Sequence, residues 1–237
     1  MNYKIYYIFT LALFNAVFPA TSSSESLLIS CYVGDIECMK KSTETFLKHT
    51  RGGIPAANIL PNDPIHISAV DAPFEVDDLV YLNKNVTVSG MANQRLEDLQ
   101  MNLGTGSVVL TTSGDVSIDG DMVQVFRIVG KSVAGRFRAY GRVLCTASYS
   151  YSFNRDGMGV EHYVVGPETN SCDLISSPVL SFISSCNAKF CPVDRKDLWK
   201  KNASKIVEQA YAVLIHNIRA AAKVLPATAF FKNPHGL

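Results

Sequence analysis

The segment Asp197–Val224, DLWKKNASKIVEQAYAVLIHNIRAAAKV, predicts a long helix that constrains the rest of this chain. Asp197 or Asp194 can cap its N-terminus, and Leu225-Pro226 stops it after Val224. Roughly 28 residues at a rise of 1.5 Å give a rod of about 42 Å. Most of the helix circumference is apolar, which is typical of a buried helix. The apolar positions are Leu198, Ile206, Val207, Ala210, Tyr211, Val213, Leu214, Ile215, Ile218, Ala221 and Ala222.

The region from about Ile65 to Ile183 has a hydrophobic period of two and predicts β-strands that cover this helix. The expected strands are Val123–Val129, Arg136–Phe153, Val160–Val165 after a hairpin turn at Asn154–Gly157, and the shorter Val80–Leu82, Val86–Val88, Ser107–Thr111 and Val116–Ile118. No repeat or low-complexity linker interrupts the region, so we expect one antiparallel sheet curved around the helix. An apolar cavity remains wherever side chains do not fill the space between them.

The segment Cys31–Pro64, CYVGDIECMKKSTETFLKHTRGGIPAANILPNDP, predicts a short amphipathic helix near the start of the chain. Asp35 can cap it, and Gly52-Gly53 ends it. Residues that can form one face recur at helical spacing: Ile36, Met39, Thr43, Phe46 and Leu47.

Residues 1–20 have the pattern of a signal peptide, with cleavage expected between about residues 20 and 24. Lys4 provides the positive start, Ile5–Phe18 is mostly apolar, and small residues follow. The apolar run is short for a membrane span, so we expect residues 21–237 to form one secreted domain without a span. The chain has 22 Lys and Arg against 21 Asp and Glu, and the signal peptide contains one of the lysines. A mature charge near zero argues against nucleic acid or an anionic membrane as partner.

The six cysteines all follow the signal peptide, and a secreted chain favours disulfides over zinc. Cys31 and Cys38 are the easiest pair. The connectivity of Cys145, Cys172, Cys186 and Cys191 stays open from the sequence. We expect no metal and no cofactor, because no His or Cys pair completes a site with Cys186 and Cys191. Sequons for N-glycosylation occur at Asn85-Val-Thr87 and Asn202-Ala-Ser204.

Catalytic motifs are missing from the sequence, so we expect a protein that is not an enzyme. There is no Gly-x-Ser-x-Gly and no His-Glu-x-x-His. Gly130-Lys-Ser132 ends like a phosphate-binding loop, but Val125 stands where the first glycine belongs. A lipocalin is the nearest rival architecture, but its early Gly-x-Trp is lacking and the single tryptophan is Trp199.

Several short motifs resemble a known family. Cys31…Gly34-Asp-Ile-Glu-Cys38, Phe46-Leu47, Gly53-Ile-Pro55 and Asp63-Pro64 are similar to the opening of the takeout-like secreted ligand carriers of insects. Gly159-Val-Glu-His-Tyr163, Gly166-Pro-Glu-Thr169, His216-Asn-Ile-Arg-Ala220, Lys223-Val-Leu-Pro226 and Phe230-Phe231 resemble the juvenile hormone-binding proteins of moth haemolymph within that superfamily. The resemblance covers about residues 26 to 233. It implies an α+β (TULIP/takeout-like) fold: a long C-terminal helix wrapped by a highly curved antiparallel sheet, with a short disulfide-tied N-terminal gate helix.

The resemblance also implies site residues. In the resembled proteins, the tyrosine at the position of Tyr149 donates a hydrogen bond to the epoxide of juvenile hormone. One buried hydroxyl can orient an otherwise apolar ligand. From the sequence alone, Tyr149 and Tyr151 could equally be ordinary strand aromatics. The expected ligand-binding residues are Tyr149, Tyr151, Phe46, Leu47, Ile54, Ile59, Phe230 and Phe231.

The cysteines depart from the family pattern. The family's second disulfide joins the position of Cys172 to a position on the last helix that is Ser204 here. We therefore hypothesise that Cys172 has switched partner to Cys186 or Cys191, while Cys145 pairs with the other or stays a buried free thiol.

These observations together predict a secreted, monomeric, haemolymph carrier of a small hydrophobic ligand, and the resemblance implies that this ligand is juvenile hormone, bound in an apolar pocket gated by the N-terminal helix. One alternative is a takeout-like carrier of another lipid, such as a fatty acid, an odorant or another terpenoid. The other is a docking protein with a filled cavity, whose partner would be a cell-surface receptor.

Overall fold

The computed structural model describes residues 26–71, 73–176, 179–183 and 196–235. The helices are α1 (Ile36–His49), α2 (Lys196–Val224) and α3 (Ala227–Phe230), with short 3-10 turns η1 (Pro55–Ala57) and η2 (Met91–Asn93). The strands are β1 (Ile65–Ala69), β2 (Phe74–Val76), β3 (Leu79–Ser89), β4 (Arg95–Asn102), β5 (Ser107–Phe126), β6 (Lys131–Arg155), β7 (Glu161–Leu174) and β8 (Val179–Ile183).

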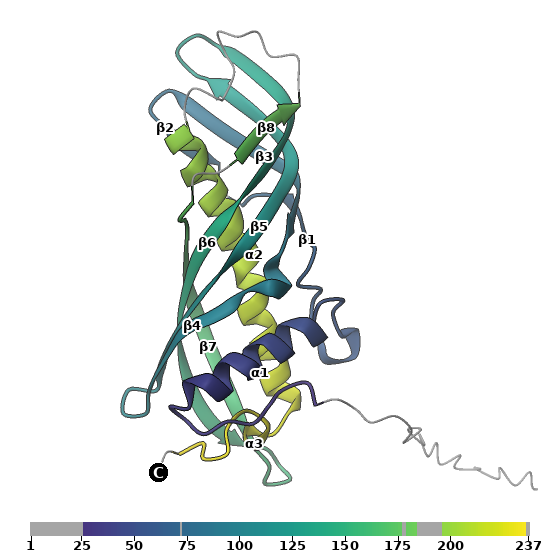
Figure 1. The fold of residues 1–237 in the computed structure, drawn as a ribbon, viewed down its shortest axis with the longest axis vertical. Coiled ribbons are helices and arrows are strands. Elements are labelled where there is room, and N and C mark those ends of the chain that lie inside the picture. Colours follow the sequence, from purple (N-terminus) through teal and green to yellow (C-terminus); the bar gives the residue numbers. More distant parts are fainter. Residues whose placement is uncertain (1–25, 72, 177–178, 184–195, 236–237) are drawn as a thin grey trace, which may run out of the picture.

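The strands form one strongly curved antiparallel sheet, and α2 runs lengthwise along its concave side (Figure 1). The order is β1-β3-β5-β6-β7, with β2 also on β3, β4 on β5 and β8 on β6. The first and last strands of this order do not pair, so the sheet is not closed. The predicted fold class, a long helix wrapped by a curved antiparallel sheet, is confirmed.

The long pair β5–β6 gives the sheet its length, since the two strands stay in register from Ser107↔Ser150 to Phe126↔Lys131. The inward side of β6 carries small residues at Ala139, Gly141 and Ala147. A Cβ at Gly141 would lie 3.3 Å from the side chain of Leu174 on β7. Small side chains on this face therefore let the sheet curve closely around the helix.

The predicted short strands are parts of longer ones. Val80–Leu82 and Val86–Val88 belong to β3, while Ser107–Thr111 and Val116–Ile118 belong to β5. The strand expected at Val123–Val129 ends at Phe126, because the next residues form the turn into β6. The sequence analysis did not single out β1, β2, β4 and β8.

The burial of α2 confirms the prediction from its broad apolar surface. Its fully buried residues include Trp199, Ala203, Ile206, Val207, Ala210, Tyr211, Leu214, Ile215 and Ala221. The helix begins at Lys196, so Asp197 lies inside it rather than before it, and Asp194 lies outside the described residues. None of the described helices is both long enough and apolar enough to span a membrane.

The first helix begins as predicted. Asp35 is its N-cap, and the Asp35 carboxylate accepts a hydrogen bond from the backbone N–H of Cys38 at 3.1 Å. The predicted Cys31–Cys38 disulfide is present and ties the preceding segment to the first turn. The helix ends at His49, and Gly53 then takes a positive φ of 77° in the loop that follows.

The hypothesis that Cys172 pairs with Cys186 or Cys191 is wrong, because Cys172 forms a disulfide with Cys145. The register of β6 and β7 places these two residues opposite each other, with their Cα atoms 4.1 Å apart. Cys186 and Cys191 lie outside the described residues. At the helix position where the family has its cysteine, the Ser204 hydroxyl accepts a hydrogen bond from the Leu174 N–H at 3.1 Å. This bond still links β7 to α2.

The two sequons have different environments. Asn85 is exposed on β3, and its amide donates only to the surface carboxylate of Asp121. Asn202 is 1% exposed, and its side chain exchanges two hydrogen bonds with buried Asn83, at 2.8 and 3.2 Å. A glycan on Asn202 would break this pair and would have no room in the core.

We therefore expect glycosylation at Asn85 and none at Asn202 in folded, secreted protein. Endoglycosidase treatment should lower the mass of the wild-type protein, and Asn85→Gln should abolish that mass change. Asn202→Gln is expected to leave the glycan in place but to destabilise the fold by about 1–3 kcal/mol, because it disrupts a buried amide pair. A glycopeptide that contains Asn202 in the secreted protein would contradict this prediction.

Candidate ligand cavity

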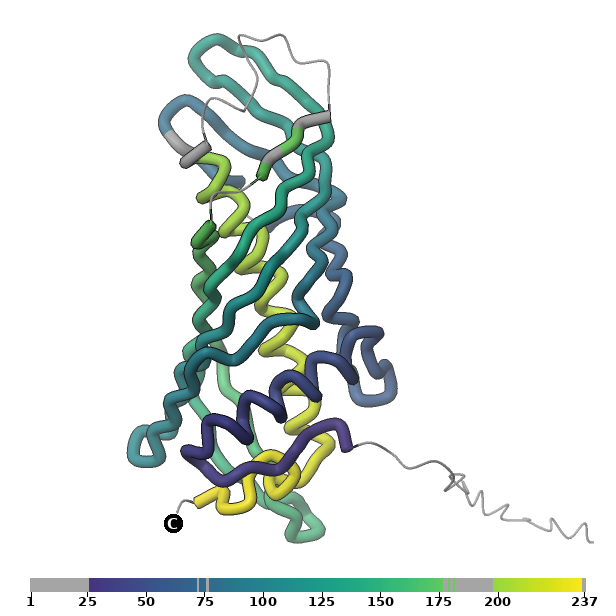
Figure 2. The backbone as a smooth tube through the Cα atoms, viewed as in Figure 1, coloured from purple at the N-terminus to yellow at the C-terminus, as the bar shows by residue number. Residues whose placement is uncertain are grey.

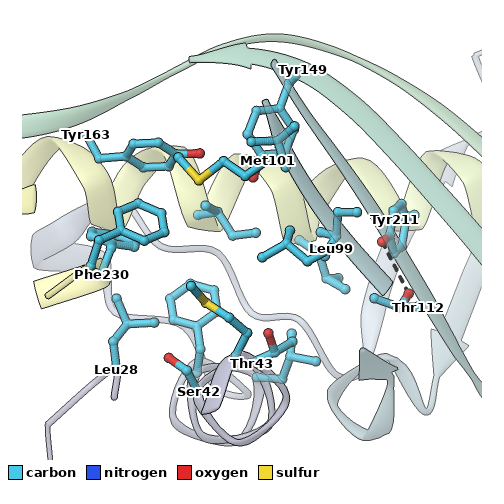
Figure 3. A pocket seen from close by; sticks show the side chains of 18 residues that line it. Leu28, Ser42, Thr43, Leu99, Met101, Thr112, Tyr149, Tyr163, Tyr211 and Phe230 are labelled. Atoms are coloured by element: carbon cyan, nitrogen blue, oxygen red, sulfur yellow. Dashed lines mark hydrogen bonds between the residues drawn. The ribbon is translucent and has the colours of Figure 1, made fainter. Parts of the chain in front are cut away.

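An apolar cavity of about 100 Å³ lies between α2, the curved sheet, α1 and the C-terminal segment (Figure 3). Its wall is almost entirely aliphatic and aromatic. The lining residues are Leu28, Met39, Ser42, Thr43, Phe46, Leu47, Leu99, Met101, Val108, Leu110, Thr112, Tyr149, Tyr163, Tyr211, Leu214, Ile218, Phe230 and Phe231.

Five of the eight predicted ligand-binding residues line this cavity: Tyr149, Phe46, Leu47, Phe230 and Phe231. Tyr149 reaches it from β6, the next two from α1, and the last two from α3 and the residue after it. They are brought together because α1 crosses the open end of the sheet next to the C-terminal segment (Figure 1).

The other three predicted residues lie outside the cavity wall. Ile54 and Ile59 pair with each other in the loop after α1, where they exchange backbone hydrogen bonds of 2.8 and 3.1 Å. Tyr151 packs its ring against Phe153 and Tyr163, and its hydroxyl donates to the Asn102 carbonyl at 3.4 Å. Of these three, Tyr151 contacts a residue of the cavity wall, Tyr163.

Sequence analysis missed several lining residues, and among them Ser42, Thr112, Tyr163 and Tyr211 carry hydroxyls. Tyr163 belongs to the family motif Gly159–Tyr163, so a signal for it was present in the sequence. Tyr211 was assigned only to the apolar face of the last helix. Thr112 had no local signal, because only the packing of β5 against α2 brings it to the cavity.

The three lining tyrosines stay neutral. Burial raises the pKa of Tyr149, Tyr163 and Tyr211 above the ordinary value, because water cannot solvate a buried phenolate. A hydrogen bond with Tyr163 and the positive charge of Arg219 lower the pKa of Tyr149 and so offset part of the rise. The hydroxyls therefore keep their protons at neutral pH and can donate hydrogen bonds to a ligand.

Arg219 on α2 holds the strand geometry behind Tyr149. Its guanidinium donates to the carbonyls of Val165 and Gly166, at 3.2 and 2.7 Å, and to the carboxylate of Glu168. At this point β7 has a bulge, since Tyr149 pairs with Glu168 but Tyr151 pairs with Val165. A Cβ at Gly166 would lie only 2.2 Å from the Ser150 hydroxyl, so the two strands approach closely there. Arg219 thus fixes the bulge beside the cavity.

The N-terminal and C-terminal segments together close the open end of the sheet, where Figure 2 shows them lying side by side. The Cys31 N–H donates to the Phe230 carbonyl at 3.1 Å, and the Lys232 N–H donates to the Cys31 carbonyl at 2.8 Å. At the other end of α1, the amide of Asn62 donates to Leu47 O and to the Thr50 hydroxyl, at 3.0 and 2.9 Å. Both ends of α1 are therefore tied to the body of the protein.

This site can enclose an elongated apolar molecule and offer it a few neutral hydroxyl groups. Apolar burial supplies the affinity, and a buried hydroxyl selects a ligand that has an acceptor at the matching place.

Comparisons with known proteins agree with this geometry. Residues 8–122 match a family model described as haemolymph juvenile hormone binding protein. The juvenile hormone-binding protein of Manduca sexta is 33% identical over 223 residues, which is 89% of this chain and 97% of that protein. The crystal structure of Epiphyas postvittana Takeout 1 has the same fold, with a TM-score of 0.72 and 16% identity over 85% of this chain and 98% of its own. The chain belongs to the haemolymph juvenile hormone binding protein family.

Proposed function

We propose that this protein is a secreted carrier that binds juvenile hormone in the cavity between α1, α3 and the sheet. Family membership and the 33% identical hormone-binding relative support the ligand class. The observation that carries the proposal is the position of the Tyr149 hydroxyl in the wall of a largely apolar cavity (Figure 3). In this proposal the hydroxyl donates to the epoxide oxygen of the hormone.

The affinity comes from burial. An apolar chain gains about 25 cal/mol for each Å² removed from water. A neutral hydrogen bond adds only about 0.5–1.5 kcal/mol, because the ligand acceptor gives up a bond to water when it binds. Tyr149 therefore contributes selectivity and orientation more than affinity. A site in which apolar burial provides the affinity and one hydroxyl provides the selectivity suits a carrier that transports a ligand without changing it.

In the same proposal α1 acts as the gate. The cavity of about 100 Å³ is smaller than the roughly 300–1,000 Å³ of ordinary ligand pockets, so an elongated ligand needs part of the wall to move outward. α1 contributes Met39, Ser42, Thr43, Phe46 and Leu47 to the wall and lies across the open end of the sheet. Its N-terminal end is joined to the C-terminal segment, so we expect the two to move together.

Secretion into the haemolymph is part of this proposal. The signal-peptide pattern of residues 1–20 and the two disulfides support an extracellular location. We expect the carrier to act as a monomer and without catalysis.

A competition assay with labelled juvenile hormone on the secreted, oxidised protein tests the proposal. We expect saturable, submicromolar binding and about 3- to 10-fold weaker binding by Tyr149→Phe, which corresponds to one lost neutral hydrogen bond. Tyr151→Phe is the matched control, because it removes a hydroxyl from the same strand outside the cavity wall and should leave the affinity unchanged.

Absence of hormone binding by folded wild-type protein would contradict the proposal. Parallel competition with fatty acids and with other terpenoids would then identify another hydrophobic ligand. Failure of every such ligand would direct attention to docking on a receptor.

A further inference from the structure

The cavity contains a second polar group that the proposed function does not use. Tyr211 on α2 is fully buried and lines the cavity. Its hydroxyl oxygen lies 3.2 Å from the Thr112 hydroxyl of β5, and this hydrogen bond is drawn in Figure 3. Thr112 lies in turn 3.3 Å from the side-chain carbonyl oxygen of Gln94. Three buried side chains thus form a hydrogen-bonded chain that ends at the cavity.

This chain lies away from Tyr149 along the length of the cavity. Tyr149 pairs with Val108 across the β5–β6 ladder, and Thr112 is four residues farther along β5. Four residues of a strand span about 13 Å. In Figure 3, Tyr163 and Phe230 lie at one end of the cavity, while Tyr211 and Thr112 lie at the opposite end. Tyr149 lies between these two ends, so its backbone position is separated from that of Thr112 along the cavity, although Tyr149 still contributes, after burial, to the raised pKa of Tyr211.

In one arrangement of the hydrogen bonds among Gln94, Thr112 and Tyr211, the Tyr211 hydroxyl remains available to donate to a ligand. Thr112 has a single hydroxyl proton but two neighbouring acceptors, the oxygens of Tyr211 and Gln94. When Thr112 donates to Gln94, Tyr211 can donate to Thr112. When Thr112 donates to Tyr211 instead, the Tyr211 proton is free to point into the cavity. The Gln94 amide nitrogen is buried and has no hydrogen-bond partner among the described residues, so a rotated amide could supply the bond that Thr112 would then lack.

We propose that Tyr211 is a second specificity-determining residue, which donates a hydrogen bond to an acceptor at the far end of the ligand from the acceptor held by Tyr149. This inference rests on the proposed function. It narrows the ligand class to elongated apolar chains with an acceptor at each end. For juvenile hormone the two acceptors are the epoxide and the ester carbonyl, and Tyr211 takes the carbonyl. Hydrocarbons satisfy neither site, and molecules with one polar end satisfy only one of the two.

Three probes separate the roles of the two tyrosines: juvenile hormone, its analogue without the epoxide, and its analogue with an ether methylene in place of the ester carbonyl. We expect Tyr211→Phe to weaken binding of the first two by about 3- to 10-fold and to leave the carbonyl-free analogue unchanged. Tyr149→Phe should weaken binding of the hormone and of the carbonyl-free analogue, and leave the epoxide-free analogue unchanged. Tyr151→Phe is the control for both.

The outcomes are distinct. If wild-type protein binds none of the probes, the proposed function fails and this inference fails with it. If wild-type protein binds but folded Tyr211→Phe weakens all three probes equally, or none of them, only the role of Tyr211 is overturned. If Tyr211→Phe does not fold, Thr112→Val answers the question, because it removes the partner that orients the Tyr211 hydroxyl. A change in affinity confined to the two probes that have the carbonyl supports the proposal, and an unchanged or unselective result overturns it.

Discussion

Trp199→Ala is expected to lower the free energy of unfolding by about 3–5 kcal/mol, the range for removing a fully buried large aromatic side chain. Trp199 has no exposed surface and packs edge-on against Phe137, with ring centroids 4.7 Å apart. Its indole nitrogen has no hydrogen-bond partner within the described residues, so the expected loss of stability comes from lost packing rather than from a lost hydrogen bond. Denaturant titration followed by circular dichroism measures the change.

The control is Tyr140→Ala on β6, the strand that carries Phe137, because the Tyr140 side chain is 52% exposed and its removal should cost little stability. Trp199 lies near the start of α2, and this end of α2 is far from α1 and α3, which contribute to the cavity wall (Figure 1). Below its unfolding transition, Trp199→Ala should therefore retain ligand affinity close to that of the wild type. Similar stability losses for the two variants would show that Trp199 does not anchor the helix.

Arg219→Met is expected to lower the free energy of unfolding by about 2–3 kcal/mol, somewhat less than for a completely buried ion pair. The variant leaves the mostly buried Glu168 carboxylate without its cation and leaves the Val165 and Gly166 carbonyls without their donor. Because these groups form the bulge opposite Tyr149, we also expect weaker hormone binding. Chemical denaturation and the competition assay measure the two effects.

A double-mutant cycle separates charge from geometry. Glu168→Gln combined with Arg219→Met removes both charges, so it should be more stable than Arg219→Met alone. The double variant still lacks the donors for the two carbonyls, so its ligand affinity should remain low. Equal stability of the single and double variants would show that the unpaired carboxylate is not the source of the cost.

Local sequence signals were sufficient for α1 and for the burial of α2. The Asp35 cap acts within one turn of helix, and the breadth of the apolar surface of α2 requires neighbours on nearly every side. The Cys31–Cys38 disulfide closes a short loop, so the sequence was also sufficient to predict this pairing. Such features depend on residues that are close in the chain, and the sequence records them directly.

Family motifs extended the prediction to part of the cavity. Tyr149, Phe46, Leu47, Phe230 and Phe231 were identified from the resemblance, and all of them line it. Ile54 and Ile59 were expected there for the same reason. However, they pair with each other in a loop, because a motif does not state which way a side chain points.

The sequence by itself therefore determined the approximate boundaries of α1 and α2, the presence of a curved antiparallel sheet and the apolar character of the core. Only the tertiary structure decided three other features: the Cys145–Cys172 pairing, the burial of Asn202 against Asn83, and the Gln94–Thr112–Tyr211 chain. The first joins two strands, the second joins a strand and α2, and the third joins the residue before β4 to β5 and α2. Their contacts depend on the strand register and on the position of α2 against the sheet. A register shift of one residue would turn each side chain of the shifted strand to the opposite face of the sheet.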